Sequence, residues 1–160
     1  PVYEQLVHQS VRLQEKLWQF YHDSFLQELA RYSPFFSPDG RSLAFFAEGR
    51  LKKVPASGGP ALALAEAPTS RGGAWAEDGT IFYSPEYTSG LWRVPASGGT
   101  PELVVDVDSD KGERTYRWPD VLPGGRAVLF TVGSLDSPND FNDAQVAALS
   151  LESGDPPGRF

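Results

Sequence analysis

The stretch LKKVPASGG at Leu51–Gly59 returns as LWRVPASGG at Leu91–Gly99, with VPASGG unchanged forty positions later. A second pair of turn-like segments, SPDG at 37–40 and AEDG at 76–79, recurs thirty-nine positions apart, and each precedes a strand-like run. A period of about forty residues with short strands and Gly-rich turns is typical of β-propeller blades. We therefore expect a mainly β fold built from four-stranded antiparallel blades.

The period divides residues 33–160 into three blades, at about 33–67, 68–110 and 114–160. The first two repeats each offer four short strands separated by turns, among them the two-residue hairpin Glu48-Gly49. After the strand predicted at 144–151 the third repeat offers no further strand pattern, so we expect that blade to lack its outer strand. Closed propellers have about four to eight blades, so this partial propeller of about three would leave two apolar faces open to self-association.

Residues 1–32 form a different kind of segment. After Pro1 they contain neither glycine nor proline, and their apolar residues recur at helical spacing opposite a polar face. The pattern predicts one N-terminal amphipathic helix. It either covers a sheet of its own domain, such as an open blade face, or serves as a docking or oligomerisation helix.

Composition limits the classes of partner. Hydrophobic residues make up 40% of the chain and aromatic residues 12%, which favours a folded core. The net charge of −7 argues against nucleic acid, and the absence of cysteine excludes disulfides and thiolate metal sites. No apolar run approaches the roughly 20 residues of a membrane span, and no signal peptide is visible. Because the chain starts at Pro1, we expect it to be a segment of something longer.

Four runs together carry a family resemblance: FFSPDGRSLAFFAEGRLKKVPASGG, RGGAWAEDGTIFYSPEYTSGLWRVPASGGTPELV, GERTYRWPDVLPGGRAVLFT and DAQVAALSLESGD. They resemble the WD-like propeller repeats of the TolB type. More narrowly, they are similar to the C-terminal propeller of bacterial serine/threonine protein kinases, in which a kinase domain and a membrane span often precede the propeller. The resemblance covers about residues 33–155.

The resemblance implies a non-catalytic binding, sensing or scaffold module with a protein or peptide partner, in an extracytoplasmic or periplasmic compartment. The chain contains no kinase Gly-rich loop, HRD or DFG motif, so we do not expect this segment to be an enzyme or to need a cofactor. The alternative is the accessory propeller of a prolyl-oligopeptidase-like serine peptidase or another hydrolase. A GxSxG motif further along the gene would favour that alternative.

The candidate ligand-binding residues share one phase of the repeat. Arg71 lies eight residues before Gly79, Arg117 lies eight before Gly125, and Tyr32 takes the matching place in the first repeat. This phase precedes the innermost strand, near the mouth of a propeller channel, where arginines bind an anionic peptide or carboxylate. The alternative is that each arginine pairs with an acidic neighbour between blades, such as Glu113 or Asp78.

Other residues suggest chemistry more weakly, and we assign no catalytic or metal site. The alternating Asp106, Asp108 and Asp110 partly match a Ca²⁺ loop, but Arg117 occupies the place of its bidentate glutamate, which favours a solvated loop. The two histidines both lie on the predicted helix and are expected to be surface residues. Aromatic residues predicted to form the core between blades are Trp75, Trp92, Trp118, Phe35, Phe36, Phe45 and Phe46.

Overall fold

The computed structural model describes residues 34–138, 141, 143–152 and 157–159. The predicted N-terminal helix and Tyr32 lie outside these residues. No helix within the described ranges is long and apolar enough to cross a membrane.

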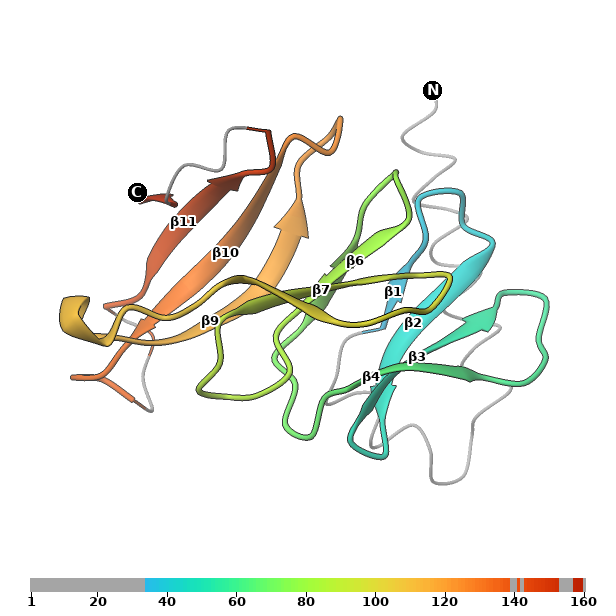
Figure 1. Ribbon diagram of the computed structural model, residues 1–160, viewed down its shortest axis with the longest axis horizontal. Coiled ribbons are helices and arrows are strands. Elements are labelled where there is room, and N and C mark those ends of the chain that lie inside the picture. Colours follow the sequence, from blue (N-terminus) through green and yellow to red (C-terminus); the bar gives the residue numbers. More distant parts are fainter. Residues whose placement is uncertain (1–33, 139–140, 142, 153–156, 160) are drawn as a thin grey trace. The chain divides into compact units, whose positions relative to one another are not determined.

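Three four-stranded antiparallel sheets make up the described fold (Figure 1), which confirms the mainly β prediction. Their strands follow the chain order from one edge of each sheet to the other, so each sheet is an up-and-down meander. The first sheet contains β1 (Phe35–Phe36), β2 (Ser42–Ala47), β3 (Arg50–Pro55) and β4 (Leu62–Glu66). The second contains β5 (Gly73–Trp75), β6 (Thr80–Tyr83), β7 (Leu91–Pro95) and β8 (Glu102–Val105). The third contains β9 (Glu113–Val121), β10 (Ala127–Ser134), β11 (Gln145–Ser150) and β12 (Gly158–Arg159), and a 3₁₀ turn at Ser109–Lys111 precedes it.

The two copies of VPASGG form the same corner of their sheets. The N–H of Gly58 donates to the carbonyl of Pro55 at 2.9 Å, and the N–H of Gly98 donates to that of Pro95 at the same distance. Gly58 and Gly98 have φ angles of 91° and 94°, which lie in the region that favours glycine. The sequence repeat is therefore also a structural repeat.

The hairpin between β2 and β3 follows the predicted two-residue turn. Glu48 and Gly49 have φ angles of 54° and 70°, as a type I′ turn requires at both central positions. Ala47 consequently pairs directly with Arg50.

The third sheet has an outer strand, so the prediction that it lacks one is wrong. Gly158 pairs with Ala148 and Arg159 pairs with Ala147. A strand of two exposed residues contains too few positions to show an alternating apolar pattern, so periodicity does not indicate it.

Two apolar clusters lie between consecutive sheets. The first joins residues of the first and second sheets: Ala44, Phe46, Leu51, Leu64, Ala65, Ala67, Ile81, Tyr83, Val94 and Ala96. The second joins residues of the second and third sheets: Ala76, Phe82, Leu91, Tyr116, Val128, Phe130, Val132, Ala147 and Leu149. The innermost strands β1 and β5 contact one another, as do β5 and β9, so the sheets stack like consecutive blades.

Candidate functional site

Three arginines converge where the second and third sheets meet, and we call Arg71, Arg114 and Arg117 the arginine cluster. The guanidinium carbons of Arg71 and Arg114 each lie 6.0 Å from the centre of the Tyr87 ring. The guanidinium carbon of Arg117 lies 4.7 Å from the centre of the Phe141 ring. The structure thus brings the two predicted arginines into one neighbourhood, together with a third arginine and two aromatic rings.

Arg71 is held by the segment that leads into β5. Its backbone N–H donates to the carbonyl of Ser84 at 2.9 Å, which fixes the backbone beside the second sheet. Its Nη1 donates to the carbonyls of Thr69 and Ser70 at 3.1 and 2.8 Å. Both of these bonds use one nitrogen, so the other guanidinium nitrogens of Arg71 donate to no described residue.

Arg117 lies on β9 and is only 9% exposed. Its Nε donates to Oγ1 of Thr115 and its Nη2 donates to the carbonyl of Tyr87, both at 3.1 Å. Burial lowers the pKa of Arg117 from its ordinary value, and the positive charges of Arg71 and Arg114 lower it further. The group stays charged at neutral pH, so the cluster is a local concentration of positive charge in an acidic protein.

Arg114 was not predicted, because a β-bulge determines its position. Thr115 pairs with Gly133 and Glu113 with Ser134, so Arg114 between them has no partner on β10. A bulge interrupts the alternation of side chains along a strand, and sequence periodicity does not show where this happens. The side chain of Arg114 is half-buried and donates through Nη1 to the carbonyl of Pro138.

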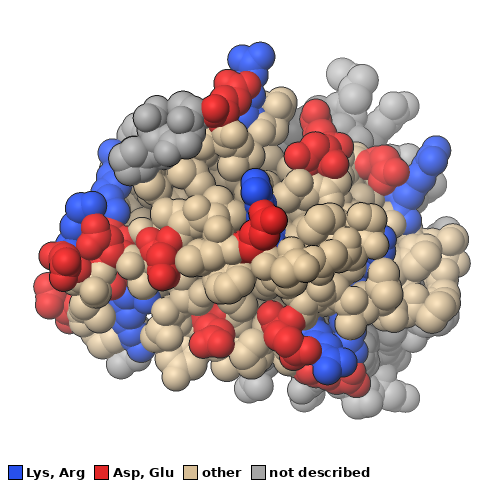
Figure 2. All heavy atoms as spheres, viewed as in Figure 1, with Lys and Arg blue, Asp and Glu red and all other residues tan. Residues whose placement is uncertain are grey.

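No described carboxylate forms an ion pair with any member of the arginine cluster. Asp78, one predicted partner, accepts the backbone N–H of Thr80 at 2.8 Å instead. Six other described cations do form ion pairs: Arg50, Lys52, Arg93, Lys111, Arg126 and Arg159. Figure 2 shows Lys and Arg mostly beside Asp or Glu on the face in view. The predicted pairing of these arginines with acidic neighbours is therefore absent from the described residues.

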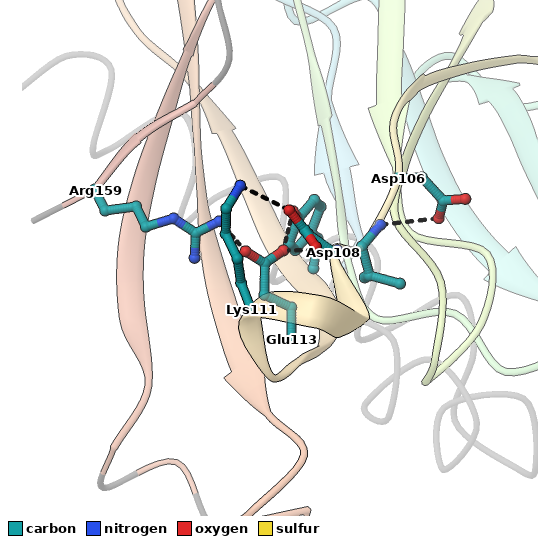
Figure 3. A network of polar contacts seen from close by, with 7 residues as sticks. Asp106, Asp108, Lys111, Glu113 and Arg159 are labelled. Carbon is teal, nitrogen blue, oxygen red and sulfur yellow. Dashed lines mark hydrogen bonds and ion pairs between the residues drawn. The ribbon is translucent and has the colours of Figure 1, made fainter.

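Glu113, the other predicted partner, belongs to a separate polar network (Figure 3). Its carboxylate is 3% exposed and accepts hydrogen bonds from the Tyr116 hydroxyl, the Arg159 guanidinium and, at 3.0 Å, the Asp108 N–H. Lys111 pairs with Asp108 at 2.6 Å, and this contact lowers the pKa of Asp108. These contacts tie β12 and the 3₁₀ turn to the start of β9. Among the described residues, no group of three or more acidic or histidine side chains could hold a metal ion.

Trp118 is 51% exposed, so the prediction that it belongs to the core is wrong. Its φ angle is 51°, and it lies at a second bulge of β9, between the pairs Arg117–Thr131 and Asp120–Leu129. Its ring lies against Phe141, with the ring centres 5.0 Å apart. The bulge therefore turns the indole out of the sheet and toward the arginine cluster.

The other predicted core aromatics behave differently from Trp118. Trp75, Trp92 and Phe35 pack against the cluster between the first two sheets, and Phe46 belongs to it. Phe45 is also buried. Among the aromatic residues near the arginines, Tyr87 is 44% exposed. Neither Tyr87 nor Phe141 belongs to a sequence pattern that would select it.

Comparison with known proteins shows the fold. Neither a protein-family model nor a curated protein sequence matches this chain. Among solved structures, TolB from Acinetobacter baumannii is similar with a TM-score of 0.60 and 14% identity over 78% of this chain. Oligogalacturonate lyase from Vibrio parahaemolyticus has a TM-score of 0.58 and 14% identity over 75% of this chain. The calcium-binding protein regucalcin from Agrobacterium tumefaciens has a TM-score of 0.54 and 16% identity over 79% of this chain.

These similarities assign the three sheets to a partial propeller of TolB-like architecture. The matches span 31% of TolB, 36% of the lyase and 41% of regucalcin. At such low identity the similarity concerns the fold alone, since one fold supports many unrelated functions.

Proposed function

We propose that this segment is a non-catalytic recognition module that binds an anionic ligand at the arginine cluster. The observation that carries the proposal is the convergence of Arg71, Arg114 and Arg117, which no described carboxylate neutralises. Keeping like charges together in a partly buried place costs free energy, as the lowered pKa of Arg117 indicates. An anion offsets that cost.

The aromatic rings prepare the arginines for such a ligand. A guanidinium group over a ring face is attracted by the ring electrons and loses part of its conformational freedom. Arg117 is also fixed by its bonds to Thr115 and Tyr87, and Arg71 by its bonds to two carbonyls. Preorganised donors bind with less loss of side-chain entropy than free arginines would.

The residues around the cluster support binding rather than catalysis. The described side chains that contact the arginines include the rings of Tyr87 and Phe141 and the hydroxyl of Thr115, and the Trp118 ring lies against Phe141. Together with the arginines they supply positive charge, N–H donors and apolar area, but no paired nucleophile and base. The fold does not decide between the two classes, because the similar structures include both TolB and a lyase.

The finer form of the proposal follows the family resemblance. In it, this segment is the extracytoplasmic propeller of a bacterial receptor-like serine/threonine protein kinase, and the ligand belongs to a protein or peptide. The alternative form is the accessory propeller of a prolyl-oligopeptidase-like serine peptidase. The full open reading frame separates the two: a kinase core and a membrane span upstream support the first, and a GxSxG motif downstream supports the second.

The binding proposal is tested by titrating the 160-residue chain with succinate in calorimetry at low ionic strength. We expect succinate to bind the parent chain with an affinity that falls as salt is added. Arg71→Gln and Arg117→Gln should each lower that affinity at least about tenfold. Arg93→Gln is the matched control, because it removes the same charge from an arginine already paired with Glu102. Equal succinate affinity in all three variants, or no binding to the parent chain, would contradict the proposal.

A further inference from the structure

We infer that the ligand of the arginine cluster is an acidic peptide segment presenting two or more carboxylates at once, and that Arg114 is the third residue that binds it. The inference rests on the proposed function and goes further, because it specifies the valence and chemical class of the ligand. It also assigns a role to a residue that the repeat pattern does not indicate.

Charge gives the first argument. The cluster contains three guanidinium groups, and a monocarboxylate would leave two of them without an anionic partner. Arg71 and Arg114 are close enough to Arg117 to lower its pKa, so the three charges act on each other rather than as separate sites. A ligand with several carboxylates removes more of this repulsion than a ligand with one.

The available donors give the second argument. The described contacts of Arg114 use Nη1 alone and those of Arg71 use Nη1 alone, while Arg117 uses Nε and Nη2. Each arginine therefore keeps at least one nitrogen that donates to no described residue. A ligand with several carboxylates has more acceptor oxygens than a single carboxylate, so it can accept from more of these nitrogens at once.

Distances give the third argument. The guanidinium carbons of Arg71 and Arg114 each lie 6.0 Å from the Tyr87 ring centre and so lie no more than 12.0 Å from one another. In an extended peptide, side chains at positions i and i+2 point to the same side and are about 7 Å apart. Carboxylates that contact both arginines must therefore come from nearby positions of a peptide, and the i, i+2 spacing satisfies this upper limit.

The aromatic rings favour a peptide over an acidic sugar. A sugar ring binds against an open aromatic face, but the Tyr87 ring already lies under two guanidinium groups, and the Phe141 ring contacts Arg117 and Trp118. The Tyr87 and Phe141 rings therefore position cations, while the Trp118 indole is 51% exposed, and the hexagalacturonate probe below tests whether that indole binds a sugar. Ionic contacts to flexible carboxylate side chains therefore suit the site better than stacking does.

The experiment compares four defined probes by calorimetry at low ionic strength: acetate, succinate, an end-capped hexaglutamate peptide and hexagalacturonate. The proteins are the 160-residue parent, Arg114→Gln, the charge-preserving Arg114→Lys and the distant control Arg93→Gln. Urea unfolding of each protein establishes that the variants are folded under the titration conditions.

We expect hexaglutamate to bind at least about tenfold more tightly than succinate, and succinate more tightly than acetate. Arg114→Gln should lower hexaglutamate affinity about three- to tenfold and succinate affinity less. Arg114→Lys keeps the charge and should lower hexaglutamate affinity less than Arg114→Gln does. Arg93→Gln should bind hexaglutamate as tightly as the parent.

Four results would overturn the inference, and they have different meanings. Tighter binding of hexagalacturonate than of hexaglutamate would assign the site to an acidic sugar. Unchanged hexaglutamate affinity in Arg114→Gln, or equal affinity for acetate and succinate, would reject the multivalent ligand while leaving the anion site in place. If no carboxylate binds the parent protein, the proposed function fails together with the inference.

Discussion

The backbone N–H of Trp118 donates a 2.8 Å hydrogen bond to the carbonyl of Arg71, and this bond joins the second and third sheets beside the arginine cluster. The contact requires a close approach of two backbones, and Gly72 permits it. A Cβ placed on Gly72 would lie 3.1 Å from the Cα of Trp118. The position of the candidate site therefore depends on one residue that has no side chain.

Gly72→Ala should destabilise the fold and weaken anion binding. Gly72 has a φ angle of 98°, and the added methyl would also press on the Trp118 backbone, so we expect a loss of about 2–4 kcal/mol in the free energy of unfolding. Gly79→Ala is the matched control, because Gly79 has a φ angle of 87° with nothing within 4 Å of its Cβ position. Urea unfolding should show a loss of only about 1–2 kcal/mol there. Equal losses in the two variants would mean that the contact with Trp118 adds no cost.

Arg159→Gln should destabilise the third sheet by leaving a buried carboxylate without its cation. Glu113 is 3% exposed, while the Arg159 side chain is 29% exposed, so solvent screens part of the effect. We expect a loss of about 1–3 kcal/mol in the free energy of unfolding. Lys111→Gln removes a cation from the same network, but the Lys111 side chain is 66% exposed. This substitution should therefore lower the free energy of unfolding by less than about 1 kcal/mol. Chemical denaturation of both variants checks the contrast, and a larger effect at Lys111 would contradict it.

The parts of this fold that the sequence predicted are those determined by local turn chemistry. Gly40 and Gly79 have φ angles of 68° and 87°, and each donates its N–H back to the first residue of its turn. Such turns follow from residue type, and their spacing identifies the repeat. The four-strand blade could therefore be predicted from the sequence for the first two sheets.

The parts that the sequence did not predict depend on contacts between distant residues. Arg114 and Trp118 owe their orientation to bulges in β9, and a bulge is visible only in the register against β10. The repeat places Arg71 and Arg117 at the same phase of consecutive blades, but it does not predict that both contact Tyr87. A loop such as the one containing Tyr87 has no periodicity from which its path could be predicted.

Tyr83→Phe should reduce the loss of stability at high pH. Burial raises the pKa of Tyr83 from 10.0 to about 12. Between pH 10 and 12 the unfolded chain releases a proton that the folded chain retains, so the free energy of unfolding falls as pH rises through this window. The fall attributable to Tyr83 is at most about 2–3 kcal/mol.

The measurement is urea unfolding of the parent and of Tyr83→Phe at pH 8, 10 and 11. The variant should show a shallower decline above pH 10 rather than none, because Tyr116 also has a raised pKa. Phe82→Leu is a useful control, since it perturbs the adjacent buried position and leaves the tyrosine in place. If Tyr83→Phe and the parent lose stability in parallel between pH 10 and 11, the assignment to Tyr83 is wrong.

Asp39→Ala should make the first turn less stable at neutral pH and have little effect in acid. The carboxylate of Asp39 accepts the Ser37 hydroxyl at 2.7 Å and the Arg41 N–H at 3.0 Å, and these bonds lower its pKa below 3.8. A lowered folded pKa gives stability that is fully present above pH 3.8 and disappears as the pH falls through the folded value. The difference in unfolding free energy between parent and variant should therefore shrink below pH 3.8.

The second repeat offers the control for this prediction. Asp78 occupies the equivalent turn and accepts the N–H of Thr80, but Ala76 stands where the first repeat has Ser37 and provides no hydroxyl. Asp78→Ala should consequently destabilise the protein less than Asp39→Ala at pH 7. A pH-independent difference between the parent and Asp39→Ala in denaturant titrations from pH 2.5 to 7 would contradict the proposed linkage.

Phe141→Leu should weaken anion binding by releasing the guanidinium group of Arg117. The Phe141 ring lies 4.7 Å from that group and 5.0 Å from the Trp118 ring, so leucine removes both aromatic contacts while keeping an apolar side chain. Losing a cation–π contact at a partly buried site costs about 1 kcal/mol, which corresponds to a roughly three- to tenfold loss of succinate affinity. Phe35→Leu is the matched control, because it removes a ring contact with Phe46 in the core between the first two sheets. Calorimetry should find succinate affinity reduced in Phe141→Leu and retained in Phe35→Leu, and the reverse result would mean that Phe141 does not position Arg117.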